Sequence, residues 1–190
     1  SVDPGPAYLG MGKMATDPEI TRRDLTMLLE GARDLGVPMI IGAAGPAGAA
    51  PHLDAVLEIV RDIAKDRGLS FNLASIRADI PKERVLKAQR AGELSPLGAF
   101  PEATEADILD SPHIVAQMDE APIVKALEGG ADVVIAGRAC DTAIYTTVAL
   151  MRGHGRALST HMAKIIECAS LCCDPGGRDS IIATLDDKGF

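Results

Sequence analysis

Apolar residues recur every three or four positions in two long segments of the chain, residues 18–35 and 51–67. This spacing predicts amphipathic helices, each with one apolar face turned toward a core. Asp17 stands where an N-cap residue is preferred. Gly36 and Gly68 follow the two segments, at positions where a left-handed residue commonly ends a helix. Both helices therefore have defined ends in the sequence.

Short apolar runs without alternation lie between the helical segments. Residues 39–41 and 133–135 contain only Met, Ile and Val. Such runs are typical of strands that are buried on both faces of a sheet. We expect further strands at residues 69–77, 113–118 and 181–185.

The remaining segments complete an alternation of strands and helices. Shorter helices are predicted at residues 81–91, about 104–110, 121–127, 141–151 and 160–173. This order predicts an α/β fold: a mostly parallel sheet with helices on both faces, Rossmann-like but not a standard dinucleotide fold. We interpret residues 1–190 as a single α/β domain of a longer protein, because both ends interrupt the pattern.

The composition narrows the function classes. The chain has 190 residues and a formal net charge of -8. This charge disfavours nucleic-acid and anionic-membrane surfaces, because both require clustered Lys and Arg. No apolar run approaches the roughly 20 residues of a membrane span. The four cysteines form no CxxC pair, so we expect no zinc site, and reduced, largely buried thiols in a cytoplasmic protein.

The segment after the first apolar strand is rich in glycine. Gly42, Gly45 and Gly48 precede the second long helix, which has His52 in its first turn. Glycine lets a backbone approach a ligand closely, and a helix N-terminus presents unpaired N–H groups that favour a carboxylate or phosphate. We expect a ligand site here, with His52 as an acid–base residue. A plain glycine-rich turn with a capping histidine is the alternative.

A second loop of this kind follows the apolar run at residues 133–135 and contains Gly137, Arg138, Cys140 and Asp141. The planar guanidinium of Arg138 suits a carboxylate or phosphate. Asp141 is either a functional carboxylate or the N-cap of the next helix. Cys140 is either a nucleophile with a lowered pKa near a helix N-terminus or a small buried residue.

A third group of polar residues falls on the helix expected at residues 160–173. His161, Lys164 and Cys168 stand at i, i+3 and i+7, and Glu167 precedes the cysteine. This spacing places an acid–base group, a cation and a thiol along one border of the helix. The alternative is an ordinary solvated edge.

Four stretches of sequence also stand out together: DPGPAYLGMGK, IIGAAGPAGAAPHLDAVLEIV, HIVAQM with ADVVIAGRACDTA, and HMAKIIECASL. In this order they resemble the acyclic terpene utilisation (AtuA-like) family, formerly a domain of unknown function, over about residues 1–190. The matching positions add Asp3 and Gly5 to the candidate site. The family has a small or hydroxyl residue near position 140, which weakens the case for Cys140 as a nucleophile.

The resemblance implies a catabolic context, because the family is associated with breakdown of acyclic terpenes and branched acids through acyl-CoA intermediates. We expect an enzyme that acts on a small carboxylate or an acyl-CoA thioester by hydrolysis, hydration or acyl transfer. The residues expected to be catalytic are His52, His161, Lys164, for a developing oxyanion, and Asp141. The expected ligand-binding residues are Asp3, Gly5, Gly42, Gly45, Gly48, Gly137, Arg138, Glu167 and Cys168.

A non-catalytic ligand-binding or assembly subunit of an acyl-CoA pathway is the alternative function. No residue spacing demands a metal, and the cofactor stays open apart from CoA as part of the substrate. The expected partners are the small-molecule carboxylate or acyl-CoA and further copies of the chain in a homo-oligomer, without nucleic acid or membrane.

Overall fold

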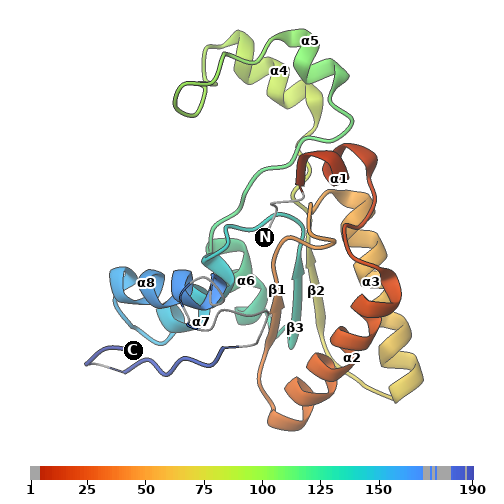
Figure 1. Cartoon of the computed structure of the whole chain (residues 1–190), viewed down its shortest axis with the longest axis vertical. Coiled ribbons are helices and arrows are strands. Elements are labelled where there is room, and N and C mark those ends of the chain that lie inside the picture. The colour runs from red at the N-terminus through yellow and green to blue at the C-terminus, as the bar shows by residue number, and fades with distance from the viewer. Residues whose placement is uncertain (1–4, 169–171, 173, 175–180, 187) are drawn as a thin grey trace.

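A three-stranded sheet with helices on both sides forms the centre of the molecule (Figure 1). The computed structural model describes residues 5–168, 172, 174, 181–186 and 188–190. In chain order the elements are α1 (Gly5–Met11), α2 (Pro18–Leu35), β1 (Met39–Ile41), α3 (Ala50–Arg67), β2 (Leu73–Ile76), α4 (Lys82–Arg90), α5 (Glu105–Asp110), α6 (Ala121–Glu128), β3 (Val133–Ala136), α7 (Ala143–Met151) and α8 (Arg156–Glu167).

The strands are parallel and lie in the order β1-β3-β2, so the last of the three in the sequence occupies the middle. Met39 of β1 and Leu73 of β2 both pair with Val133. Every residue of β3 is buried. A middle strand has neighbours on both edges, which explains why its sequence is apolar without alternation.

Successive residues of β3 face opposite layers of helices. Val133 and Ile135 pack in the core that α2 and α3 form on one face. Val134 packs on the other face with Ile123 of α6 and Ala143 of α7. Each such fully buried aliphatic side chain contributes about 1.5–3 kcal/mol to stability. The predicted α/β fold, a parallel sheet covered on both faces, is confirmed.

The ends of the two long helices also agree with the sequence. Asp17 caps α2, and its Oδ1 accepts from the Glu19 backbone N–H at 2.8 Å. Gly36 and Gly68 end α2 and α3 in the left-handed conformation, with φ of 63° and 62°. These positive φ values favour glycine because it has no Cβ.

Residues 81–112 form a helical excursion that leaves the sheet after β2 and returns before α6. Figure 1 shows α4 and α5 side by side at one end of the molecule, apart from the sheet. Arg90 of α4 and Glu105 of α5 form an ion pair, with Nε 2.7 Å from Oε1. At the base of the excursion the Ile80 N–H donates to the Ile114 carbonyl at 2.9 Å. The excursion therefore rests on a narrow two-chain neck.

The strand predicted at residues 113–118 is wrong. This segment is extended, but it pairs only at two isolated points: Asp79 with Val115 in antiparallel fashion, and Met118 with Ala139 in parallel fashion. It changes partner between the two points, so a continuous ladder cannot form. Its hydrogen-bonding groups serve to join the neck of the excursion to the end of β3.

The strand predicted at residues 181–185 is also wrong, since this segment is extended without pairing and Ile182 is 93% exposed. β2 covers only the second half of the run expected at 69–77. The sequence pattern does not predict the short helix α1. Its sequence, GPAYLGM, has two glycines and no helical apolar stripe, so nothing in its pattern predicts a helix.

The helix expected at residues 160–173 begins earlier, at Arg156, and ends at Glu167. Ser159 lies within the first turns of this helix, where its buried hydroxyl donates to the Gly155 carbonyl at 2.9 Å. The far end of the expected helix lies partly outside the described residues.

Candidate functional site

Two connections leave the sheet in opposite directions at its carboxyl edge. β1 continues into α3, which packs on one face, whereas β3 continues into α7, which packs on the other. Where neighbouring parallel strands diverge in this way, a crevice opens beyond their carboxyl ends, and ligands of open α/β sheets bind there. The crevice between β1 and β3 is therefore the expected position of a site.

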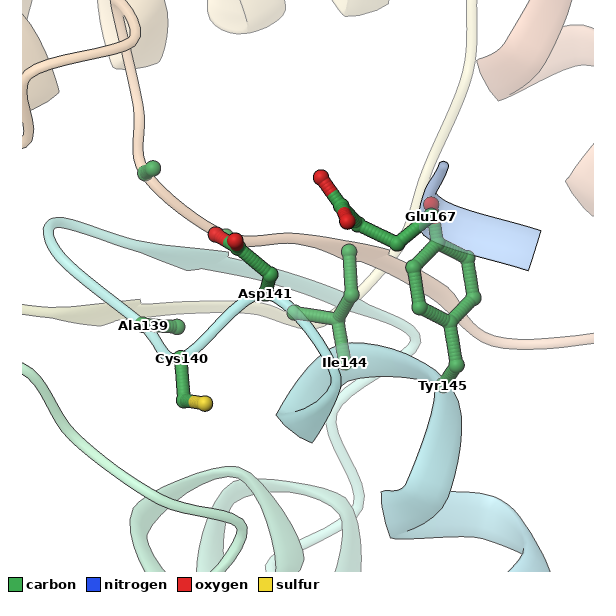
Figure 2. Close-up of a pocket in the computed structure, with 8 residues that line it drawn as sticks. Ala139, Cys140, Asp141, Ile144, Tyr145 and Glu167 are labelled. Carbon is green, nitrogen blue, oxygen red and sulfur yellow. The ribbon is translucent and has the colours of Figure 1, made fainter. Parts of the chain in front are cut away.

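A pocket of about 150 Å³ occupies this crevice (Figure 2). Its lining comes from both strand exits and from α7 and α8: Gly42, Ala43, Ala139, Cys140, Asp141, Ile144, Tyr145 and Glu167. In Figure 2 the carboxylates of Asp141 and Glu167 project toward the same space, and the ring of Tyr145 lies beside Glu167. The structure thus brings together Gly42, Asp141 and Glu167 among the residues expected at the site.

Two contacts hold the Glu167 carboxylate at the end of α8. The Cys168 thiol donates to Glu167 Oε2 at 2.8 Å, and Lys164 Nζ lies 2.6 Å from the same oxygen. These two hydrogen bonds keep the pKa of Glu167 below its ordinary value, although burial acts in the opposite direction. Glu167 is therefore ionised at neutral pH. Its hydrogen bond also raises the pKa of Cys168, which stays a thiol.

Tyr145 is the neutral counterpart of this carboxylate. Burial, followed by the negative charges of Glu167 and Asp141, raises the pKa of its phenol above the ordinary 10.0. At neutral pH the pocket therefore contains a protonated phenol next to an ionised carboxylate. Such a pair supplies both a proton donor and a proton acceptor.

Arg138 lies beside the pocket residue Asp141 but is not part of the pocket lining. Its Nη1 lies 3.9 Å from Asp141 Oδ1, which is too long for a hydrogen bond, and the two side chains are 13% and 32% exposed. Arg138 Nη1 is buried and has no hydrogen-bond partner among the residues that the structure describes. A buried donor without an acceptor is unfavourable. This nitrogen is thus an unsatisfied donor next to a pocket residue.

The interpretation of Asp141 as a helix cap is wrong. The N-cap of α7 is Thr142, and no side-chain hydrogen bond caps the helix there. Asp141 instead lines the pocket. Cys140 is half-buried, and its Sγ lies 3.6 Å from Thr142 Oγ1. The cysteines differ in exposure, since Cys172 is exposed rather than buried as expected.

The glycines of the two strand exits allow the two loops to touch. A Cβ on Gly48, which has a φ of 80°, would lie 2.1 Å from the Gly137 carbonyl oxygen. A Cβ on Gly137 would lie 2.4 Å from the Gly48 carbonyl oxygen. A Cβ on Gly42 would lie 2.6 Å from Cγ2 of Ile144. At Gly48 and Gly137 two backbones meet directly, whereas at Gly42 the neighbour is the side chain of Ile144, so none of the three positions has room for a Cβ.

The expectation of unpaired N–H groups at the start of α3 is wrong. The Ala50 N–H donates to Asp79 Oδ1 at 2.9 Å, and Pro51 has no N–H. The N–H groups of His52 and Leu53 both donate to the Ala49 carbonyl at 3.0 Å. A carboxylate from the exit of β2 therefore occupies the place where an anion was expected.

The two histidines expected to be catalytic lie outside the pocket lining. His52 is fully buried, and its Nε2 donates to the Tyr8 carbonyl of α1 at 2.9 Å. His161 is exposed and packs edge-on against Phe190, with ring centroids 5.1 Å apart. Lys164 contacts the pocket only through Glu167. Gly45 packs against His52, Gly5 begins α1, and Asp3 lies outside the described residues.

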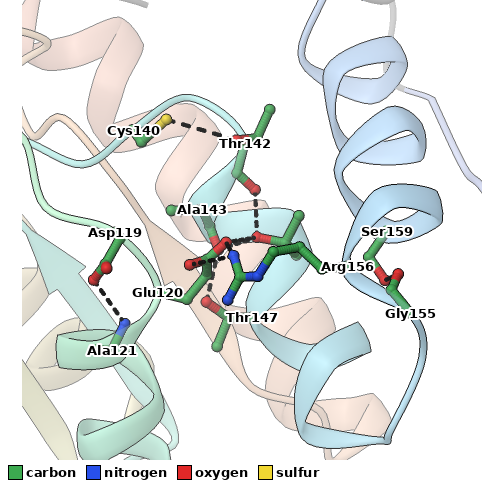
Figure 3. Close-up of polar contacts among 11 residues, drawn as sticks. Asp119, Glu120, Ala121, Cys140, Thr142, Ala143, Thr147, Gly155, Arg156 and Ser159 are labelled. Carbon is green, nitrogen blue, oxygen red and sulfur yellow. Dashed lines mark hydrogen bonds and ion pairs between the residues drawn. The ribbon is translucent and has the colours of Figure 1, made fainter.

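A polar cluster behind the pocket joins three helices (Figure 3). Glu120, next to the start of α6, accepts from Thr146 Oγ1 of α7 at 2.8 Å. Arg156 of α8 donates to both oxygens of Glu120, at 3.0 and 3.1 Å. These contacts fix α7 and α8 relative to each other, and so position the Tyr145 and Glu167 side chains that face the pocket.

Sequence reasoning missed Tyr145 and the Glu120 cluster. Tyr145 stands four residues after Asp141, a spacing that puts two side chains on one side of a helical turn. This signal was present in the sequence. Glu120 offers no such signal, because its partners Thr146 and Arg156 are 26 and 36 residues away.

A comparison with known families decides the identity of the chain at family level. Residues 18–187 match the family described as acyclic terpene utilisation family protein AtuA. The chain belongs to this family. The resemblance seen in the sequence is confirmed, and AtuA membership implies involvement in acyclic terpene utilisation. Both strand exits and the end of α8 lie within the match, so the pocket belongs to the part shared with the family.

No curated protein and no solved structure matches this AtuA family chain. Among the described residues, no group of three or more His, Cys, Asp or Glu side chains is placed to hold a metal ion. No helix in the described part of the chain has both the length and the apolar character needed to cross a membrane.

Proposed function

We propose that this AtuA family chain belongs to a catabolic enzyme that acts on a small carboxylic acid or its CoA thioester. The acyl end of the substrate binds in the pocket between β1 and β3, where proton transfer takes place. The observation that supports this proposal best is the pairing of an ionised carboxylate, Glu167, with a neutral phenol, Tyr145, in a crevice at the carboxyl ends of parallel strands.

This pair favours hydration over acyl transfer. In hydration of an α,β-unsaturated thioester, Glu167 accepts a proton from water as the water oxygen bonds to the β carbon. Tyr145 donates a proton to the α carbon. Glu167 then releases its proton to solvent, and Tyr145 is reprotonated from solvent. Acyl transfer needs an activated nucleophile. Cys140 is the thiol in the pocket, and no histidine is among the pocket residues.

Two positively charged side chains near the pocket suit a substrate whose oxygen atoms carry negative charge. Arg138 Nη1 is buried without a hydrogen-bond partner in the described part of the chain, and it lies 3.9 Å from the pocket residue Asp141. Lys164 contacts Glu167 at the other side. We assign Arg138 to the carboxylate or thioester oxygen, because a guanidinium donates to such oxygens in a fixed plane. Asp141 orients the guanidinium through its charge.

The size of the pocket limits what it holds. A cavity of about 150 Å³ accommodates a group of roughly the size of benzene. It therefore takes the reacting end of an acyl chain, while a CoA moiety would remain outside the crevice. His52 and His161 take no part in this proposal, because neither lines the pocket.

The test is turnover of CoA thioesters of branched, α,β-unsaturated acids. We expect the protein to hydrate at least one of them in D₂O, with deuterium incorporated at the α carbon, as followed by NMR. Glu167→Gln should lower kcat by about 100-fold or more and Tyr145→Phe by about 10-fold or more, since general acid–base catalysis contributes on the order of 10²–10⁴.

The matched control is Glu105→Gln, which removes an exposed carboxylate from the excursion and should leave turnover unchanged. Thioester binding is measured alongside by calorimetry. Turnover that is equal in all three variants contradicts the assignment. Thioester binding without turnover of any substrate supports the non-catalytic ligand-binding function instead.

A further inference from the structure

α2 has two apolar faces, of which only one is used within the chain. Its inner face packs in the core through Leu25 and Leu29, which are 7% and 0% exposed. On the other side of the helix, four large apolar side chains and one glycine form what we call the outer stripe: Ile20, Met27, Leu28, Gly31 and Leu35. The four side chains are 52%, 60%, 56% and 77% exposed. A second apolar face of this kind marks an interaction surface.

We propose that the outer stripe of α2 is a homodimer interface, in which α2 packs antiparallel to α2 of a second copy about a two-fold axis near Met27 and Leu28. A two-fold interface requires a self-complementary surface, because each residue must meet its symmetry-related counterpart. The order of residues along the stripe meets this requirement.

The apolar positions pair symmetrically about that axis. Ile20 of one copy lies opposite Leu35 of the other, and Met27 and Leu28 of both copies come together at the axis. Asp24, the acidic residue within the stripe, faces Gly31 of the other copy. A Cβ on Gly31 would meet nothing within 4 Å in the chain itself, so the space above it is free for Asp24. No two like-charged side chains meet in this register.

Charges along the border of the stripe are complementary in the same register. Arg23 is exposed near the N-terminal end of α2, where it forms an ion pair with Asp24 of the same chain at 2.8 Å, whereas Asp34 is exposed near the C-terminal end. Both stand on the same side of the stripe, so the antiparallel arrangement brings Arg23 of each copy to Asp34 of the other. Symmetry makes two such pairs.

The expected dimer is weak and leaves the pocket open. A standard interface buries about 800 Å² per partner, and one pair of helices covers less than this. We therefore expect a dissociation constant in the micromolar range or above. α2 lies with α3 on one face of the sheet, whereas α6 and α7 lie on the other. The inference thus stands independently of the proposed function.

Sedimentation equilibrium tests the interface. We expect the unaltered chain to dimerise reversibly at high concentration, and Met27→Asp to raise the dissociation constant by at least 10-fold because it puts two acidic groups at the axis. Leu97→Asp is the control, since Leu97 is 87% exposed on the helical excursion and should leave the constant unchanged. Circular dichroism confirms that each variant is folded.

Charge reversal tests the register. Arg23→Glu alone and Asp34→Lys alone should each weaken self-association several-fold, because like charges then meet twice. A mixture of the two variants should form heterodimers at least as readily as the unaltered chain, because both pairs are then restored. A chain that is monomeric at every concentration overturns the proposal. So does a dimer that Met27→Asp leaves intact, or a mixture that associates no better than its components.

Discussion

The two loops that leave β1 and β3 meet at the same crevice but differ in character. The loop of residues 42–49 contains only glycine, alanine and one proline, and most of it is buried. The loop of residues 137–142 contains Arg138, Cys140 and Asp141, and its polar side chains are partly exposed. The first loop packs against the second. The second supplies Cys140 and Asp141 to the pocket, whereas Tyr145 and Glu167 come from α7 and α8.

This difference shows that, within one site, the loop richest in glycine need not be the loop that carries the polar side chains. Gly48 and Gly137 place two backbones in contact, which shapes the crevice. The helix after the glycine-rich loop has no free first-turn N–H, because Asp79 occupies it. The helix after the charged loop has no side-chain cap. A glycine-rich loop before a helix is thus insufficient evidence of an anion site.

The largest expected effect comes from filling the contact between the loops. Gly48→Ala should lower the free energy of unfolding by on the order of 3 kcal/mol, because its Cβ would overlap the Gly137 carbonyl at a φ of 80°. Gly36→Ala has a similar φ of 63° with nothing near its Cβ, so it should cost only about 1 kcal/mol. Urea denaturation measures both. If both variants lose the same free energy of unfolding, the close contact between the two loops does not contribute to the cost at Gly48.

A smaller effect on stability is expected at the first turns of α3 and α7, and it should differ between the two helices. Asp79→Ala should destabilise the protein by about 1 kcal/mol, since it removes the acceptor at the start of α3. Asp79→Asn keeps an acceptor oxygen and should cost less. Thr142→Ala should change stability by less than about 0.5 kcal/mol, because its side chain caps nothing. Thermal unfolding of the three variants gives the order, and a reversed order would contradict the capping assignment.

The smallest expected effect is on the pH dependence of kcat/KM, through the pKa of Glu167. Lys164 helps to lower the pKa of Glu167, so Lys164→Met should raise that pKa. Glu167 acts as a base only when ionised, and activity falls as the pH drops through its pKa. The acid limb of the kcat/KM profile should therefore move to higher pH in this variant. The control is Lys65→Met, which removes an exposed lysine of α3 and should leave the acid limb in place. A shift in both variants would show that the contact between Lys164 and Glu167 is not the cause.

Much of the fold could be read from local pattern. The spacing and caps of α2 and α3 fixed their ends almost to the residue, and the apolar runs of β1 and β3 identified buried strands. The segment at 113–118 failed because an apolar run says nothing about its pairing partners, which here change along the segment. α1 failed because tertiary contacts outweigh weak helix propensity.

The site was predictable in part. The strand exits placed Gly42 and Asp141 at the carboxyl edge of the sheet, and both line the pocket there, although their role in a site stays a prediction. Which side of a helix faces the crevice depends on how α8 packs against α7, and this is set by the Glu120 cluster. The sequence could not reveal that packing. Glu167 therefore lines the pocket while His161, on the same helix, does not. The interpretation of residues 1–190 as one domain of a longer protein stays a prediction.

The position of β3 in the middle of the sheet has a consequence for synthesis and folding. β1 and β2 each pair with β3, and β3 is made about 60 residues after β2. As the chain leaves the ribosome, α2, β1, α3 and β2 are complete before the strand that joins them exists. Such non-local pairing slows folding. The edges of β1 and β2 therefore stay unpaired until β3 has been made, and a chaperone would be needed most during this interval.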